Sequence, residues 1–239
     1  CCCLCMKGPQ PKSSQCHSRV SITFFLLTLV LALFSWIGSV YGMGEVQSLL
    51  SAEGIRWVLG HTLENYVQAP ALGMVLVFFM GLGVGVRSGL YDALRRFLQK
   101  GKMISRKERR ALVLSVSVFV LLGVMVGISL FLPWNLFWGV TGGWLHSPIS
   151  KGMVYLLAVG VGLAGMIYGY VADVYRNLSD VLQGMSCLIA RRASFFVTLF
   201  FVVQFFSSLE YVRLAEFLHC PEDILSVIYQ LCCFIPMFF

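Results

Sequence analysis

The chain has 239 residues, of which 58% are hydrophobic and 12% are charged, whereas an ordinary soluble domain carries about 25% charged residues. A soluble protein of this size cannot hide so much apolar surface, because small folds leave much of the chain exposed, and disorder needs the opposite composition. The net charge of +7 does not indicate a nucleic-acid partner, since the basic residues lie in loops between apolar stretches. We therefore expect a polytopic membrane protein in a lipid bilayer.

Six apolar stretches are candidates for membrane-spanning helices, because about 20 apolar residues are needed to cross the hydrocarbon core. The fifth stretch is short, and the sixth contains Pro236. The predicted fold class is all-α, with five to six transmembrane helices and one interfacial amphipathic helix. The predicted domains are a basic, cysteine-rich tail over 1–19 and a single transmembrane domain over 20–239. The predicted spans are residues 20–43, 67–86, 111–132, 152–172, 193–209 and 224–239.

The basic residues give the orientation. Fifteen of the 18 Lys and Arg residues fall in the N-terminal tail and in the loops after the second and fourth spans. Because such loops stay in the cytoplasm, we place the N-terminus there. These residues serve mainly as orientation signals, and binding of anionic lipid is an alternative.

Three of the expected connecting segments have a recognisable pattern. Residues 51–66 predict an amphipathic helix in the outer interface, with Ser48 or Ser51 as its cap and Glu53 in its first turn. Residues 133–148 form a Trp-rich outer loop, which suits the interfacial aromatic belt, with ligand stacking as an alternative. Residues 90–99 are expected to prolong the second span as a helix. The apolar face of the amphipathic helix consists of Ile55, Val58, Leu59, Thr62, Leu63 and Tyr66.

The second, third and fourth spans each carry two glycines four residues apart. Small residues let helices approach closely in lipid, where burial alone does not drive association. We expect these glycines to pack helices within a bundle or a dimer. They are Gly81 and Gly85, Gly123 and Gly127, and Gly165 and Gly169.

Four of the nine cysteines lie within the first five residues. Adjacent cysteines do not easily wrap one tetrahedral ion, so this spacing predicts no zinc site. Acylation of membrane-proximal cysteines is one alternative. Another is that the chain does not begin at its natural start, because it lacks an initiator Met.

The sequence contains no common enzyme motif, and its four histidines have no partner at ligand spacing. We therefore expect neither an enzyme nor a metal or cofactor site. Asp173 and Asp180 lie seven residues apart and are expected to be solvated loop acids, although a shared helical face is an alternative. Gln204 is the main strongly polar side chain within a span. It is a weak candidate for substrate binding, and a hydrogen bond to a neighbouring helix is the other interpretation.

Several segments in order resemble the p-aminobenzoyl-glutamate transporter family, called AbgT. LLSAEGIRWVL at Leu49–Leu59 and APALGMVLVFFMGLGVGVRSGL at Ala69–Leu90 are similar to the family's outer amphipathic helix and second span. The segment over Ser147–Ser186, with its YGYVAD motif, is similar to a later span and loop. FVVQFF matches a family FPLAQF span, with Gln204 on the family Gln. The resemblance covers roughly Val20–Leu218.

The resemblance implies a homodimeric carrier in the bacterial inner membrane, coupled to a proton or sodium gradient. Its substrate would be p-aminobenzoyl-glutamate or a related aminobenzoate or antifolate compound. The chain departs from the family at Val86 and Arg87, where an Ala-Glu pair is usual. After Leu90 it runs into a basic loop that joins the family's later half, and it stops at Phe239 before the second substrate hairpin. None of its residues aligns with the transport-site residues of those hairpins.

Two hypotheses follow. In the first, the chain is a shortened AbgT-type transporter that keeps the scaffold spans and lacks both substrate hairpins. We do not expect such a chain to move substrate alone, because alternating access uses discontinuous helices in paired positions. In the alternative, it is a non-transporting membrane scaffold or a partner subunit.

Overall fold

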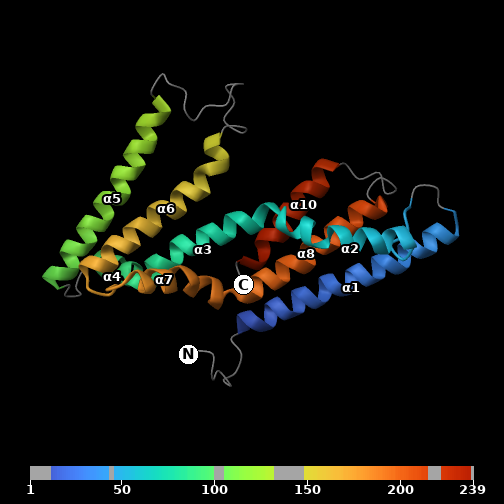
Figure 1. The fold of residues 1–239 in the computed structure, drawn as a ribbon, viewed down its shortest axis with the longest axis horizontal. Helices are drawn as coiled ribbons and strands as arrows, with labels where there is room; N and C mark the ends of the chain where they lie inside the picture. The colour runs from blue at the N-terminus through green and yellow to red at the C-terminus, as the bar shows by residue number, and fades with distance from the viewer. Residues whose placement is uncertain (1–11, 43–45, 100–104, 132–147, 215–221, 238–239) are drawn as a thin grey trace. The chain divides into compact units, whose positions relative to one another are not determined.

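The computed structural model describes residues 12–42, 46–99, 105–131, 148–214 and 222–237. This described part is all-helical (Figure 1), which confirms the predicted fold class. The chain divides into a terminal unit, residues 1–73 with 192–239, and a central unit, residues 74–191. The prediction of one transmembrane domain behind a tail stays a prediction. Within the described residues, five helices are long and apolar enough to cross a membrane: His17–Val40, Pro70–Ser88, Arg106–Ile128, Gly152–Val171 and Ala193–Val212.

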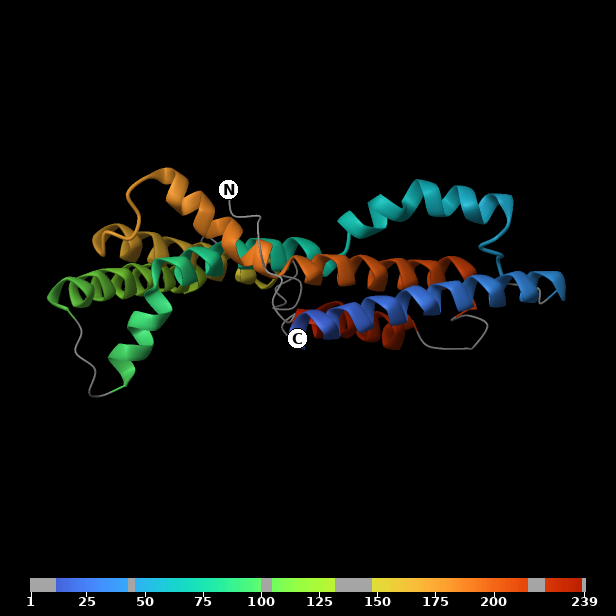
Figure 2. The same ribbon diagram turned by 90° about the horizontal axis from the view of Figure 1, so that it is seen from below.

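The terminal unit is built on two parallel helices, α1 (Lys12–Val40) and α8 (Ala193–Val212), which lie side by side (Figure 2). Near the start of both helices, the hydroxyl groups of Ser21 and Thr198 form a hydrogen bond of 3.0 Å. Further along, the rings of Phe24 and Phe205 meet edge to face with centroids 5.7 Å apart. Parallel packing means that both helices begin at the same side of the membrane.

Helix α2 (Ala52–Val67) contacts α8 in the opposite direction, and its start follows the prediction. The Ser51 hydroxyl accepts the Gly54 backbone N–H at 3.0 Å, which caps the first turn. The predicted apolar face is divided into a packed stripe and an exposed stripe. Val58 is half-buried, whereas Leu59 and Leu63 are 80% and 73% exposed. Two such leucines beside a packed stripe suit a helix that dips one side into the lipid interface.

The end of the terminal unit is helix α10 (Glu222–Phe234) followed by the 3-10 turn η1 (Ile235–Met237). The apolar segment Ile224–Met237 is shorter than the five membrane-crossing helices. Pro236 lies in the 3-10 turn, where its missing N–H and fixed φ are tolerated. Residues 238–239 of the sixth predicted span, the tail over 1–11 with its four cysteines, and most of the Trp-rich loop lie outside the described residues.

The central unit pairs α5 (Arg106–Phe131) with α6 (Pro148–Val171) in an antiparallel hairpin. α3 (Pro70–Ser88), whose first residues belong to the terminal unit, packs on α6, and α4 (Leu90–Leu98) and α7 (Leu178–Arg191) complete the unit. One core cluster holds α4 against the α5–α6 hairpin. It consists of Leu90, Ala93, Ala111, Leu112, Ala164 and Tyr168.

Two segments of the central unit differ from the prediction. Residues 90–99 do not continue the second span, because Gly89 takes a left-handed conformation, with φ +79°, that ends α3 and lets α4 begin separately. The loop after the fourth span contains the helix α7. Asp173 lies in the turn before it with φ +60°, and Asp180 lies in its first turn. The two carboxylates therefore do not share a helical face.

Candidate functional site

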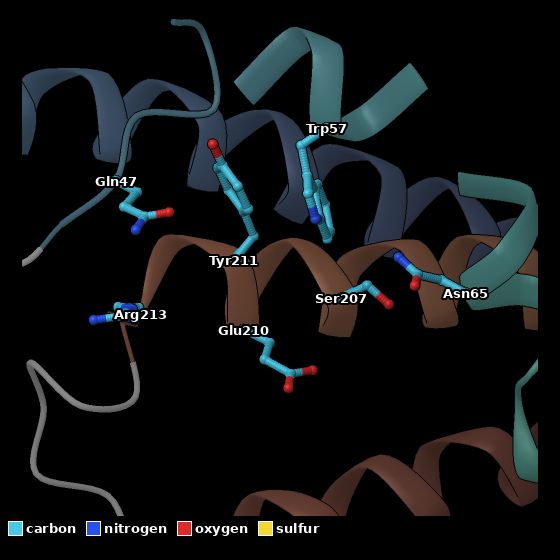
Figure 3. Close-up of a pocket in the computed structure, with 7 residues that line it drawn as sticks. All are labelled: Gln47, Trp57, Asn65, Ser207, Glu210, Tyr211 and Arg213. Atoms are coloured by element: carbon cyan, nitrogen blue, oxygen red, sulfur yellow. The ribbon is translucent and has the colours of Figure 1, made fainter. Parts of the chain in front are cut away.

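A polar pocket of about 290 Å³ lies in the terminal unit, between α2 and the last two turns of α8 (Figure 3). α2 supplies its aromatic and amide groups, and α8 supplies a hydroxyl, a carboxylate and a second ring. Gln47, which lies five residues before α2, and Arg213, the residue after α8, complete its lining. The lining residues are Gln47, Trp57, Asn65, Ser207, Glu210, Tyr211 and Arg213.

Stacked rings form one wall of this pocket. Trp57 and Tyr211 face each other with centroids 4.5 Å apart and planes 26° from parallel. One turn further along α2, the His61 ring also stacks on Trp57, with ring centroids 5.4 Å apart and planes 16° from parallel. The result is a layered aromatic surface at the end of two membrane-associated helices, which is where tryptophan and tyrosine are favoured.

The polar groups around the rings offer both donors and acceptors. The Asn65 side-chain nitrogen is buried and has no hydrogen-bond partner among the described residues. Glu210 is exposed, and Arg213 ends α8 in the left-handed conformation with φ +56°. Gln47 is tied to the end of α8 by its backbone N–H, which donates to the Val212 carbonyl at 3.3 Å. The pocket therefore presents hydrogen-bond donors and acceptors beside an aromatic surface.

Toward the start of α8, a second contact also fixes α2 against this helix. The Tyr66 hydroxyl donates to the Phe196 carbonyl at 3.1 Å. Burial raises the pKa of Tyr66 above its ordinary value, so the hydroxyl stays protonated as a donor at neutral pH. The hydrogen bond and the ring stack together hold α2 at two points two to three turns apart.

Gln204 lies on α8, three residues before Ser207 and seven before Tyr211, so it continues the pocket face about one to two turns deeper. Its side chain is half-buried. Its role in substrate binding stays a prediction. Within the described residues, no group of three or more metal-binding side chains occurs.

Four of the six singled-out glycines lie at close helix contacts in the central unit. A Cβ on Gly81 would come within 2.1 Å of the Ala158 carbonyl oxygen, and one on Gly165 would come within 2.8 Å of the Gly85 Cα. Gly81, Gly85 and Gly165 therefore let the backbones of α3 and α6 touch. Gly169 instead makes room for the ring of Tyr175, which a Cβ would meet at 2.2 Å.

Gly123 and Gly127 on α5 are different, because no atom of the described chain lies within 4 Å of a Cβ built at either position. Val120 and Val124, which lie on the same side of α5, are also largely exposed. This face of α5 is thus not used for packing by the described residues of the chain.

Most pocket residues were not singled out from the sequence. Trp57 lies in the helix predicted for the outer interface, but its pairing with Tyr211 is not predicted by the sequence. The available signal was periodic, since Trp57, His61 and Asn65 are spaced by four, and Glu210 and Tyr211 follow Ser207 by three and four. Such spacing gives the face of each helix. It does not say that two helices about 150 residues apart pack together.

Five apolar helices of membrane-crossing length in an all-helical fold define a multi-pass membrane protein. The model of the AbgT putative transporter family matches residues 19–100 and 95–222. The chain therefore belongs to the AbgT family, as the sequence resemblance predicted.

Relatives and solved structures agree with this assignment. The chain is similar to the p-aminobenzoyl-glutamate transport protein of Escherichia coli (strain K12), with 23% identity over 163 residues, covering 64% of this chain and 31% of that protein. It thus spans about a third of that relative. The YdaH transporter of Alcanivorax borkumensis has a TM-score of 0.67 at 17% identity, covering 83% of this chain and 72% of that chain. MtrF of Neisseria gonorrhoeae, described among antimetabolite efflux pumps, has a TM-score of 0.74 at 16% identity, covering 83% and 70%.

Proposed function

We propose that this chain carries the scaffold of an AbgT-type secondary transporter for p-aminobenzoyl-glutamate or a related aminobenzoate or antifolate compound. The observation that carries the proposal is the family match over residues 19–222. The Escherichia coli relative, named for p-aminobenzoyl-glutamate transport, supports the substrate class.

The chemistry of the pocket supports the same substrate class. A p-aminobenzoyl-glutamate molecule combines an aromatic ring, an amide and carboxylates. Tyr211 and the edge of Trp57 offer aromatic contacts, Asn65 offers an unused amide donor, and Arg213 carries a guanidinium, a group that suits a carboxylate. We assign this pocket as a docking site for the substrate at the end of α8.

We further propose that the chain is shortened relative to the family. The family model matches in two segments that meet at residues 95–100. This junction covers the last turn of α4 and the start of the basic loop after it, and the sequence resemblance placed the loss of the first substrate hairpin after Leu90. On this proposal the chain sits in the bacterial inner membrane as a homodimer, with its N-terminus in the cytoplasm and transport coupled to a proton or sodium gradient.

Binding and transport can be tested separately. Titration of the purified chain with p-aminobenzoyl-glutamate is expected to quench tryptophan fluorescence, because Trp57 lines the pocket. Trp57→Phe is expected to lose most of this quenching. Trp36→Phe is the matched control, because Trp36 is 51% exposed on α1 and outside the pocket. Equal quenching in both variants would remove the pocket from the proposal.

Transport is measured as uptake of labelled p-aminobenzoyl-glutamate into proteoliposomes, with and without an imposed ion gradient. Gradient-dependent uptake above that of empty liposomes supports a carrier. No uptake by well-folded protein refutes transport by this chain alone.

The second candidate function is a non-transporting scaffold or partner subunit, and the open face of α5 favours it. Gly123 and Gly127 provide the small residues that helix pairs use in lipid, yet no described residue packs on them. A single cysteine placed beside Gly123 is expected to cross-link between two copies, whereas one beside Gly165, within the α3–α6 contact, is not. Exclusively monomeric protein from the Gly123 site would contradict the scaffold function.

A further inference from the structure

Helix α4 is amphipathic, and only part of its apolar side is used for packing. Leu90 and Ala93 are buried in the core cluster with α5 and α6, and Leu94 packs against that cluster. Phe97 and Leu98, at the far end of the helix, are 49% and 72% exposed. The core of the central unit therefore holds the first turns of α4 and leaves apolar side chains open at its end.

The contacts of α4 place it at the level where α5 changes from charged to apolar sequence. Ala93 packs in one cluster with Ala111 and Leu112 of α5. The five residues before this point, RKERR over 106–110, are all charged, and the uncharged apolar run begins at Ala111. The membrane-crossing helix α3 also ends at Ser88, just before α4. Such a boundary lies in the headgroup layer, so α4 lies at the membrane–water interface.

The orientation of α4 turns its open apolar edge toward the bilayer. Figure 2 shows α4, in green, leaving the line of α3 and running across it, as a helix in the interface does. One edge is held on the water side, because Arg96 pairs at 3.6 Å with Glu108 in the first turn of α5. On the other edge, the Tyr91 ring reaches back along α3, where a Cβ built on Gly85 would lie 3.1 Å from its Cε2 atom. Leu98 follows Tyr91 by seven residues and shares this second edge, so it points toward the hydrocarbon.

The segment around α4 carries the excess positive charge of the chain. Residues 87–110 contain nine basic and two acidic residues, an excess that equals the net charge of +7 of the whole sequence. Arg96 and Lys107 are used in ion pairs within the chain. The other arginines of α4 and of the start of α5 are exposed and form no ion pair with the described residues. They are Arg95, Arg106, Arg109 and Arg110. A surface of this kind is complementary to an anionic partner.

We propose that α4 and the start of α5 form a docking surface for a bilayer of anionic phospholipid, with Leu98 among the acyl chains and the arginines on the phosphate groups. Arg95 lies three residues before Leu98, so its charge is beside the inserted edge and reaches the headgroups. A lipid is favoured over a soluble anion such as a nucleic acid, because only a bilayer covers an exposed leucine and binds the adjacent cations. The proposal assigns the lipid binding that the sequence left open to a defined surface, and it does not depend on the proposed transport function.

The test measures how well the bilayer shields the two edges of α4. Leu98→Cys and Asp92→Cys, both at exposed positions, are made in the full chain and reconstituted in nanodiscs of phosphatidylcholine alone or of phosphatidylcholine with phosphatidylglycerol. A water-soluble maleimide labels the thiols, and mass spectrometry of the peptides that cover α4 gives the rate. The native cysteines do not interfere, because none lies between Cys16 and Cys187.

Leu98→Cys is expected to be labelled at least about five-fold more slowly when phosphatidylglycerol is present, in line with the attraction of a basic residue to an anionic surface. Asp92→Cys, on the polar side of the helix, is expected to change by less than about two-fold. This second variant also corrects for any effect of the charged bilayer on thiol reactivity, which is common to both positions. Equal shielding of the two positions would overturn the insertion of the apolar edge.

The charge is tested by Arg95→Gln in the Leu98→Cys chain, which is expected to raise labelling several-fold in nanodiscs with phosphatidylglycerol. A high salt concentration is expected to do the same, because it screens the attraction. Arg176→Gln is the matched control, because it removes the same charge from an exposed position in the segment before α7. It is expected to change labelling by less than about two-fold. Equal effects of the two arginine variants, or equal shielding with and without phosphatidylglycerol, would overturn an anionic bilayer as the partner of this surface.

Discussion

Replacing Gly81 by alanine tests whether the backbones of α3 and α6 are in direct contact. The added Cβ would lie 2.1 Å from the Ala158 carbonyl oxygen and 2.9 Å from the Ala158 Cα, and both are backbone atoms that cannot rotate away. An ordinary contact begins at 3.4 Å, so the helices must part by more than an ångström at this point. Overpacking of this kind costs about 1 to 3 kcal/mol.

Gly73→Ala is the matched control, because it makes the same change on the same helix at a position where a Cβ meets no described atom. Alanine is better than glycine in a helix by about 1 kcal/mol. This gain is common to both variants, so the difference between them isolates the cost of the contact, about 1 to 3 kcal/mol. The assay is thermal unfolding of detergent-purified protein, with Gly81→Ala melting below the wild type and Gly73→Ala at or above it. Equal melting temperatures for Gly81→Ala and Gly73→Ala would refute the contact.

Three further predictions concern single contacts. Gly54→Ala is expected to destabilise the start of α2, because a Cβ would lie 2.5 Å from two backbone carbonyl oxygens. Gly60→Ala on the same helix is expected to be neutral or stabilising, because its Cβ meets no atom within 4 Å. Thermal melts of both variants test this, and equal melting temperatures would contradict the close contact at Gly54. Tyr175→Phe removes a buried 2.8 Å hydrogen bond to a carbonyl of α3 and is expected to cost about 1 kcal/mol in thermal or denaturant unfolding, and an unchanged stability would contradict a role for the hydroxyl. The hydrogen bond and charge of Lys107 lower the pKa of Asp173 below its ordinary value of 3.8. The pair therefore stabilises the fold above pH 3.8, and this contribution is lost as the pH falls through the lowered pKa. The difference in melting temperature between wild type and Lys107→Met should be present at neutral pH and vanish in acid, and a difference that does not depend on pH would contradict the pairing.

The membrane helices could be predicted because their signal is local. An uncharged apolar run of membrane length needs no knowledge of the rest of the fold. The same holds for the start of α2, where Ser51 and Glu53 follow ordinary capping rules. The break at Gly89 was missed because a glycine within a helical pattern is compatible with continuation. Whether it takes φ +79° depends on the packing of Leu90 and Ala93 against α5 and α6.

The pocket and the glycine contacts could be predicted only in part, because both depend on which helices meet. The pattern of Gly81 and Gly85 is the same as that of Gly123 and Gly127. The structure separates them, since a Cβ on Gly81 meets the backbone of α6 and one on Gly123 meets nothing described. Likewise, the spacing along α8 gives one face for Ser207 and Tyr211, but only tertiary packing brings Trp57 to that face.

The positions of the acidic residues lead to a last prediction, which rests on the proposed transport function. All 11 acidic residues of the sequence lie outside the six predicted spans, and Glu210, within the membrane-crossing segment of α8, is exposed near its end. Carboxylates within the membrane are the usual proton carriers of transporters, whereas sodium is also held by neutral oxygens, including backbone carbonyls. Neutral polar groups along α8 include those of Gln204, Ser207 and Ser208. Any uptake by proteoliposomes that contain this chain is therefore expected to follow a sodium gradient and to stop when choline replaces sodium. Uptake driven by a proton gradient alone, in the absence of sodium, would show that these neutral groups do not couple transport to the ion gradient.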